Sequence, residues 1–250
     1  MPATDAVLYK AHVKNLRALE AGLSEIKRDL NRAIADENIA LTETLKKLYL
    51  FLAGAWAECR LKKLMYETSG FNGAQRALIS AERSQADRWQ KSLELGFRKR
   101  YGLPRAPLSD RTLSATAWFR FAATRQIIAE NLEPLIGLRN TLAHGQWARP
   151  LNSEETDISS VLIAQMNQEN ALTVKFKLQL ITSMAELIHD LIASRSFERD
   201  FDIHYGLVTT ALTNLQKRSY AKWQQSMIEK KRRGRAKRDT AIVAYSRSPE

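Results

Sequence analysis

The chain has 250 residues, 44% of them hydrophobic, so it can bury a sizeable core in one large domain or two small ones. Glycine (10) and proline (6) are scarce, which predicts a mostly helical fold and argues against an extensive β-sheet. The net charge of +12 is uneven: between Lys217 and Arg238 ten basic residues stand against Glu229 alone, so this segment contributes +9. This end of the chain is therefore expected to bind a polyanion.

The sequence also indicates the cellular compartment of the protein. Its single cysteine, Cys59, cannot form an internal disulfide, which is typical of a reducing compartment. The first residues, MPATDAVLYK, lack the basic and apolar segments of a secretory signal. The longest apolar run, Leu48 to Ala57, is about half the length of a membrane span. We expect a cytoplasmic protein without membrane contact.

The first half of the chain is predicted to be helical throughout. Apolar residues at three- and four-residue steps from Val7 to Ile34 predict one long amphipathic helix. A second helix is expected over 39–66, and its middle, LYLFLAGAWA, is apolar on every side, which places it at the centre of a bundle. A third helix is expected over 75–101, before two prolines that forbid its continuation.

Ser109 or Asp110 is expected to cap a fourth helix that runs to about residue 131. Pro134 then suits the first turn of a new helix, and Gly145 suits a left-handed C-terminal cap. A short helix from Pro134 to His144 follows from these two signals.

The second half is less regular. Residues 148–157 are predicted as a loop, and the alternation in LTVKFKL allows a small β-hairpin within 161–177. Helical periodicity returns over 178–192 and from about Tyr205 toward Lys231. The predicted organisation of this all-α chain is a long N-terminal helix over 1–36, a helical bundle over 37–196, a C-terminal helix over 197–232 and a basic flexible tail over 233–250.

The segment LRNTLAHGQW, residues 138–147, combines side chains that suit phosphodiester chemistry. In a helix Asn140 and His144 share a face, and the long side chain of Arg139 can fold back toward them. Histidine transfers protons near neutral pH, and a guanidinium binds phosphate through two hydrogen bonds. In RNA a base can deprotonate the 2′-hydroxyl for attack on phosphorus while an acid protonates the leaving 5′-oxygen. Arginine would stabilise the charge that develops on phosphorus.

One histidine cannot easily act as both base and acid in a single turnover. A two-fold homodimer would supply a second copy of the same cluster across the interface. Unequal surroundings could then leave one imidazole protonated and the other neutral. Dimerisation is therefore expected to be part of the mechanism.

The heptapeptide RNTLAHG resembles the signature of the HEPN ribonucleases, in which an arginine, a polar residue and a histidine lie near the end of a core helix. The resemblance covers about residues 41–192. It implies a HEPN-like bundle and a metal-independent endoribonuclease without cofactor, which leaves 2′,3′-cyclic phosphate and 5′-hydroxyl ends. Arg139 and His144 would be catalytic and Asn140 would support them. It also implies a toxin or antiviral defence effector, often dimeric with a composite site, controlled by an inhibitor or defence-complex partner.

Three alternatives remain open at the motif. The segment RDFDIH, Arg199 to His204, has the same spacing, but its alternating Phe201 and Ile203 suggest an extended connector. His144 could instead interact with the last carbonyls of its helix. The chain could also be a non-catalytic helical RNA-binding or scaffold module that uses the motif for phosphate docking or dimerisation.

Two further features are candidates for the site. Some HEPN proteins place an acidic residue near the arginine, so Glu58 could orient Arg139; a surface pair of Glu58 with Lys62 is the favoured interpretation. The basic run could contact RNA phosphates or be a solvated tail without function. Trp223 and Tyr220, which precede it, could stack on bases or pack inside the protein. The residues predicted to bind RNA are Lys230, Lys231, Arg232, Arg233, Arg235, Lys237 and Arg238.

Overall fold

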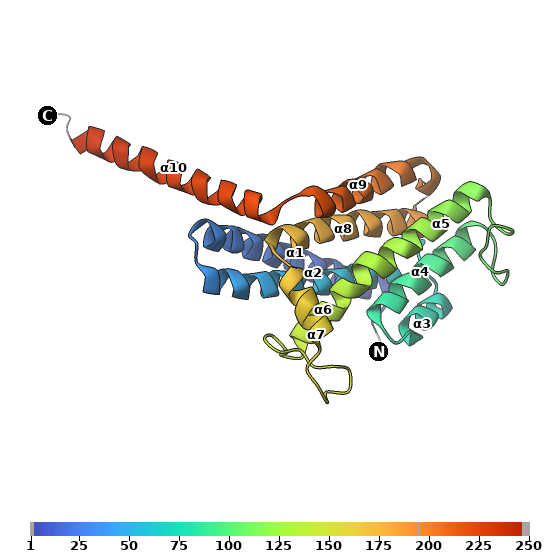
Figure 1. Ribbon diagram of the computed structural model, residues 1–250. Helices are drawn as coiled ribbons and strands as arrows, with labels where there is room; N and C mark the ends of the chain where they lie inside the picture. The colour runs from blue at the N-terminus through green and yellow to red at the C-terminus, as the bar shows by residue number, and fades with distance from the viewer. Residues whose placement is uncertain (1–2, 195, 247–250) are drawn as a thin grey trace.

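The computed structural model describes residues 3–194 and 196–246 and shows a bundle of helices (Figure 1). Apart from one isolated bridge between Leu151 and Ile158, these residues contain no β-structure, which confirms the all-α prediction. In chain order the helices are α1 (Asp5–Ala35), α2 (Ile39–Met65), α3 (Gly73–Ala81), α4 (Gln85–Arg100), α5 (Ala115–Ile127), the π-helix η1 (Ile128–Leu132), α6 (Glu133–Ala143), α7 (Ser160–Gln168), α8 (Ala171–Ala193), α9 (Phe197–Lys217) and α10 (Tyr220–Ser246).

Helices α1 and α2 form an antiparallel hairpin at the centre of the molecule. Glu37 adopts a φ of 59° in the turn, and Asn38 Oδ1 accepts a hydrogen bond from the Leu41 N–H at 3.1 Å, which caps α2. Ala53 and Ala57 in the apolar middle of α2 are fully buried, because α1, α6 and α8 pack around this helix. The predicted bounds of both helices and the central position of α2 are confirmed.

The single helix predicted over 75–101 is instead two helices, α3 and α4. Ser84 Oγ accepts a hydrogen bond from the Asp87 N–H at 3.0 Å, and the Asp87 carboxylate accepts one from the Ser84 N–H. This capping box starts a new helix where the apolar periodicity continues without a break. The capping box thus sets a helix boundary that the apolar periodicity does not reveal.

Helix α5 begins at Ala115 with Ser114 as its cap, so the caps predicted at Ser109 or Asp110 are wrong. It continues through η1 into α6, and these elements form one rod that crosses the bundle (Figure 1). Pro134 lies in the first turn of α6, and Gly145 has a φ of 77° just beyond its end, as predicted.

No hairpin forms within 161–177, where α7 ends and α8 begins. Asn170 Oδ1 accepts hydrogen bonds from the N–H groups of Leu172 and Thr173, and the Thr173 hydroxyl accepts one from the Asn170 N–H. Helix α8 contacts α2, α4 and α9, and its burial on several sides outweighs the alternating pattern that suggested strands.

The C-terminal segment also differs from the prediction. It divides at Arg218 and Ser219 into α9 and α10, and α10 stays helical to Ser246, so the irregular tail predicted from residue 233 is wrong to that point. Residues 247–250 of the predicted tail lie outside the described residues. Figure 1 shows α10 leaving the bundle as a projecting helix. In the described part of the chain, no helix combines the length and apolar character that a membrane crossing requires.

Candidate functional site

Arg139 lies where α6 crosses α2, and Gly54 of α2 allows the two helices to approach closely. A Cβ atom at Gly54 would stand 2.5 Å from Arg139 Cβ and 2.7 Å from its Cγ. The stem of Arg139 therefore covers the glycine, and its Cζ lies 5.8 Å from the centre of the Phe51 ring. Gly54 and Phe51 are absent from the predicted site, although a lone glycine inside an apolar helix signals a close backbone approach.

Two oxygen acceptors orient the guanidinium of Arg139. Its Nη2 donates to Glu58 Oε2 at 2.9 Å, and its Nη1 donates to Asn140 Oδ1 at 3.0 Å. The side chains of Arg139 and Glu58 are 28% and 25% exposed, so the group is fixed but reachable from solvent. Arg139 Nε is buried without a hydrogen-bond partner among the described residues.

Glu58 joins both interactions that the sequence suggested for it. Its Oε1 accepts a hydrogen bond from Lys62 Nζ at 2.8 Å while its Oε2 accepts from Arg139. Burial raises the pKa of Glu58, but the hydrogen bond from Lys62 and the charges of Lys62, Arg139 and Arg88 outweigh it and hold the pKa below its ordinary value. Glu58 is therefore an acceptor that holds Arg139 in place at neutral pH.

The end of α6 fixes the backbone of His144. Gly145, in its left-handed conformation, donates its N–H to Leu142 O at 3.1 Å. The Gln146 N–H donates to Thr141 O at 3.1 Å. These two bonds form a Schellman motif, which ends a helix at a glycine. His144 is thus held at a rigid helix end.

The imidazole of His144 is exposed and, in the described part of the chain, forms no hydrogen bond or ion pair with another side chain. The helix-end carbonyls of Thr141 and Leu142 accept from backbone N–H groups, and Leu142 O also accepts from Trp147 Nε1 at 2.9 Å. The alternative in which His144 satisfies these carbonyls is therefore not observed. Asn140, one turn earlier on α6, is also exposed, as the shared-face prediction requires.

The structure therefore brings Glu58, Arg139 and Asn140 into contact and places His144 one turn further along α6. Because His144 is five positions from Arg139, it lies about 140° around the helix axis from that residue. A ligand that contacts both Arg139 and His144 must therefore pass over Asn140, which lies between them on the helix surface. The arrangement can grip an anion with a fixed guanidinium and offer it a nearby imidazole.

The second motif, RDFDIH, is helical, so the expectation of an extended connector is wrong. It belongs to α9, where Arg199 Nε lies 2.6 Å from Asp200 Oδ1. His204 Nε2 instead lies 3.2 Å from Asp190 Oδ2 on α8. Arg199 and His204 thus pair with different carboxylates, although the two pairs are close enough for Asp190 to act electrostatically on Arg199 and His204 on Asp200.

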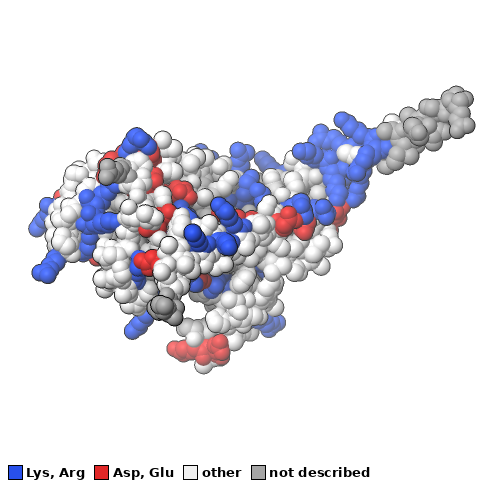
Figure 2. Space-filling model, turned by 180° about the vertical axis from the view of Figure 1, so that it is seen from behind, with Lys and Arg blue, Asp and Glu red and all other residues white. Residues whose placement is uncertain are grey.

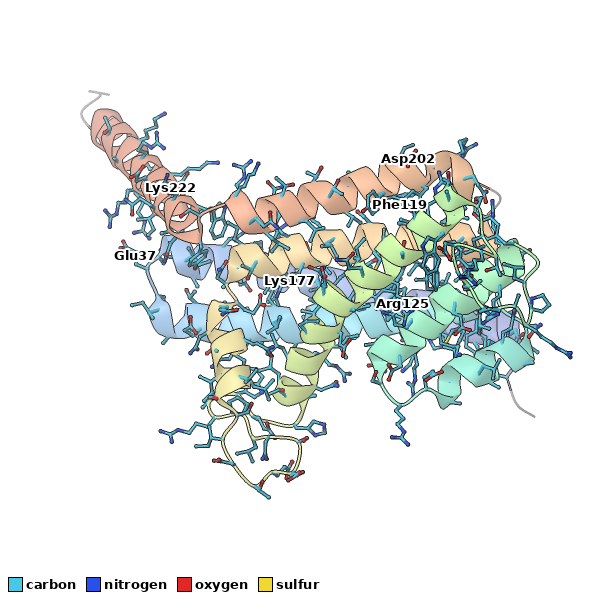
Figure 3. All side chains as sticks on the ribbon, turned by 45° about the vertical axis from the view of Figure 1, so that its right-hand side comes forward. Glu37, Phe119, Arg125, Lys177, Asp202 and Lys222 are labelled. Carbon is cyan, nitrogen blue, oxygen red and sulfur yellow. The ribbon has the colours of Figure 1, made fainter. Side chains whose placement is uncertain are left out.

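The basic residues predicted to bind RNA lie on α10, and several of them contact acidic residues of this chain. Lys231 and Arg235 pair with Asp36, the latter at 2.6 Å, and Arg232 Nη2 donates to Glu37 Oε1 at 2.7 Å. Figure 3 shows Glu37 at the turn between α1 and α2, and its partner Arg232 lies near the middle of α10. The remaining predicted RNA contacts are exposed: Lys230, Arg233, Lys237 and Arg238.

The aromatic residues at the start of α10 pack in part against the bundle. Tyr220 and Trp223 have ring centres 5.8 Å apart, and both are partly buried against the core. In the described residues, no group of three or more His, Cys, Asp or Glu side chains is arranged to hold a metal ion. Comparison with protein-family models, with curated proteins and with solved structures finds no significant match to this chain.

Proposed function

We propose that this protein is a metal-independent endoribonuclease whose cleavage site contains Arg139 and His144 and is supported by Glu58 and Asn140. One observation carries the proposal: acceptors from two helices fix an accessible guanidinium five residues before an exposed imidazole that has no partner among the described residues. Transition-state stabilisation requires donors that are oriented before the reaction begins.

Each group has a distinct task in the proposed reaction. His144 moves the proton of the 2′-hydroxyl or of the leaving 5′-oxygen, and the products are a 2′,3′-cyclic phosphate and a 5′-hydroxyl. Each Nη of Arg139 carries a second N–H besides the one given to Glu58 or Asn140, and these remain for phosphate oxygens. Glu58 and Asn140 are positioning residues, because they act through Arg139.

The reaction needs a base and an acid, which two copies of His144 in a homodimer would supply. Ile158 and Val161 are 44% and 65% exposed and follow the site in sequence, and α7, which contains Val161, packs against α6. We place the contact with the second copy of the chain at these exposed apolar side chains beside α6. The HEPN resemblance suggests a toxin or antiviral defence effector, restrained by a partner.

The test is cleavage of mixed RNA by the purified protein in EDTA. We expect His144→Ala and Arg139→Ala to lower the rate by about 100-fold or more, the usual effect of losing a proton-transfer group or an anion-stabilising donor. His204→Ala is the matched control, because its spacing to Arg199 is the same but it lies on α9, and it should keep the wild-type rate. Thermal unfolding confirms that each variant is folded.

Cleavage retained by folded His144→Ala would contradict the proposal. Wild-type protein that binds RNA without cutting it would also contradict it, and would favour the alternative of a non-catalytic RNA-binding or scaffold module.

A further inference from the structure

A second basic surface lies at the junction of α9 and α10. A groove of about 550 Å³ there is lined by four cationic side chains, and none of its lining residues in the described chain is acidic. Phe176 and Trp223 provide its apolar wall. The cations of this basic groove are Lys175, Lys217, Arg218 and Lys222.

None of these four cations forms an ion pair within the described residues. Arg218 Nε donates to the neutral Asn214 Oδ1 at 3.3 Å, and Lys175 Nζ lies 5.3 Å from the centre of the Phe176 ring. Lys217, Arg218 and Lys222 are exposed. Like charges around one hollow repel each other, so a bound anion would stabilise all of them.

Further cationic side chains continue from the groove along one face of α10. Lys230, Arg233 and Lys237 follow Lys222 at steps that place them on the same side of a helix, and we call these three the outer stripe. Lys231 and Arg235, which bind Asp36, point to the opposite side, and Arg232, which binds Glu37, lies between the two sides; these contacts fix the position of the helix. Figure 2 shows Lys and Arg side chains gathered on this projecting helix. Glu229 lies between Lys222 and Arg233 on this side of the helix and accepts a hydrogen bond from Gln225.

The length of this surface favours a polymer over a single phosphate. Fifteen residues separate Lys222 from Lys237, which is about 22 Å along a helix. A cationic track beside a partly exposed Trp223 is the combination that binds single-stranded nucleic acid, where the phosphates meet cations and an unpaired base stacks on an aromatic ring.

The groove and the proposed cleavage site lie on different sides of the bundle. Helix α9 packs on α8, α8 on α2, and α2 on α6, and Figure 1 and Figure 3 both show α9 and α10 on one side and α6 with α7 on the other. Because Lys175 and Phe176 of α8 line the groove, two helix-to-helix spacings of 8–10 Å, or about 16–20 Å, separate it from α6. A dinucleotide at one site would not reach the other.

We propose that the basic groove and the outer stripe bind the backbone of single-stranded RNA, with Trp223 stacking on a base. The choice of RNA rests on the proposed ribonuclease function, whereas the binding itself does not require cleavage. The surface would hold a long substrate while a different part of the strand occupies the site at Arg139 and His144.

The experiment measures binding of a fluorescent single-stranded RNA with 2′-O-methyl groups, which lacks the 2′-hydroxyl needed for cleavage, to the full-length protein. The triple variant Lys217→Ser, Arg218→Ser, Lys222→Ser should bind at least tenfold more weakly. The logarithm of the binding constant falls as the logarithm of the salt concentration rises. In the triple variant this slope should become less steep by about 2, or 0.7 for each lost phosphate contact. The control is a second triple variant, Arg83→Ser, Arg105→Ser, Arg111→Ser, which removes the same charge from exposed residues in the α3–α4 and α4–α5 connections. It should bind the RNA as the wild type does.

Stacking of an RNA base on Trp223 is tested with separate variants. Trp223→Leu should weaken binding about fivefold or more, whereas Trp223→Phe keeps an aromatic face and should bind nearly as the wild type does. An RNA duplex of the same length and anionic lipid vesicles should bind more weakly than the single strand. Equal or tighter binding of either would overturn the assignment to single-stranded RNA.

Failure of this proposal can be told apart from failure of the ribonuclease proposal. If the two triple variants bind the probe equally, the groove proposal is wrong even when the protein cuts RNA. If the wild type binds the probe through the groove but cleaves no RNA, the groove proposal stands and the ribonuclease proposal is wrong. In a protein with both properties, the groove variants should slow cleavage of long RNA and leave that of a dinucleotide unchanged.

Discussion

Glu58 accepts one hydrogen bond from Lys62 on its own helix and one from Arg139 on α6, so it links the two helices of the site. We predict that Glu58→Gln lowers RNA cleavage by up to about 100-fold, because small misplacement of a reacting group has effects of this size. The free energy of unfolding should change by about 1 kcal/mol or less, since the ion pair is partly exposed.

The measurement compares kcat/KM with thermal unfolding for each variant. Glu43→Gln, which removes a surface acceptor of Lys46 on the same helix, is the control and should change neither quantity. Equal cleavage by Glu58→Gln and the wild type would show that Glu58 does not position Arg139.

Gly54 is the second residue on which the site depends. Gly54→Ala gains helix propensity of about 1 kcal/mol, but its Cβ would overlap the Cβ of Arg139 at 2.5 Å. We predict a net destabilisation of about 1–3 kcal/mol, typical of overpacking, together with loss of cleavage. In the control Gly22→Ala, the new Cβ meets only Leu52 Cδ1 at 3.7 Å, so chemical denaturation should show equal or higher stability. A stable, active Gly54→Ala protein would contradict the close crossing of α2 and α6.

Part of the site can be predicted from single residues, and part cannot. Arg139, Asn140 and His144 are close in sequence, so a helix alone predicts where they lie relative to one another. The contact of Arg139 with Glu58 and its passage over Gly54 depend on how α6 crosses α2. Gly54 signals a close approach to α2, but the local sequence does not specify that α6 is the helix that crosses there.

At the scale of helices, the C-terminal end of α6 determines the position of His144. Gly145→Ala would place a side chain at a φ of 77°, which costs about 1–2 kcal/mol and should move the imidazole. We predict lower stability and slower RNA cleavage. Gly137→Ala on the same helix is the control: a Cβ there meets nothing within 4 Å, so the helix should gain up to about 1 kcal/mol. If both variants behave alike in unfolding and cleavage, the helix end does not position His144.

Periodicity predicts helices well and their interruptions poorly. The regular apolar spacing of α1 and the continuous apolar middle of α2 predict their bounds to within a few residues. The starts of α4 and α8 instead depend on single capping boxes at Ser84 and Asn170, inside segments whose apolar pattern continues or alternates. Tertiary contacts, which a local pattern does not contain, make α8 helical despite its alternation.

For the whole molecule, the acidic turn between α1 and α2 holds α10 against the bundle. The hydrogen bond from Lys231 is the main cause that keeps the pKa of Asp36 below its ordinary value. A carboxylate with a lowered pKa keeps its contacts above the ordinary range and loses them as pH falls through the lowered value. We therefore predict that acid, or high salt that screens these exposed charges, releases α10.

Limited trypsin digestion measures this release, because cleavage within α10 requires the helix to open. The double variant Asp36→Asn, Glu37→Gln should be cut faster than the wild type at neutral pH and low salt. The control Glu154→Gln, Glu155→Gln removes the same charge from an exposed loop and should be cut at the wild-type rate. Equal rates for the two double variants would show that the acidic turn does not hold α10.

The most direct test of the central claim is the fate of RNA whose 2′-hydroxyl is missing at the cleaved linkage. Because the proposed nucleophile belongs to the substrate, the protein should cut an all-ribose strand in EDTA and leave 2′,3′-cyclic phosphate and 5′-hydroxyl ends. A strand with a single 2′-deoxyribose at the cut position should bind but stay intact there. Cleavage at the deoxyribose, or products with 5′-phosphate ends, would contradict a site in which Arg139 and His144 act on the 2′-hydroxyl of RNA.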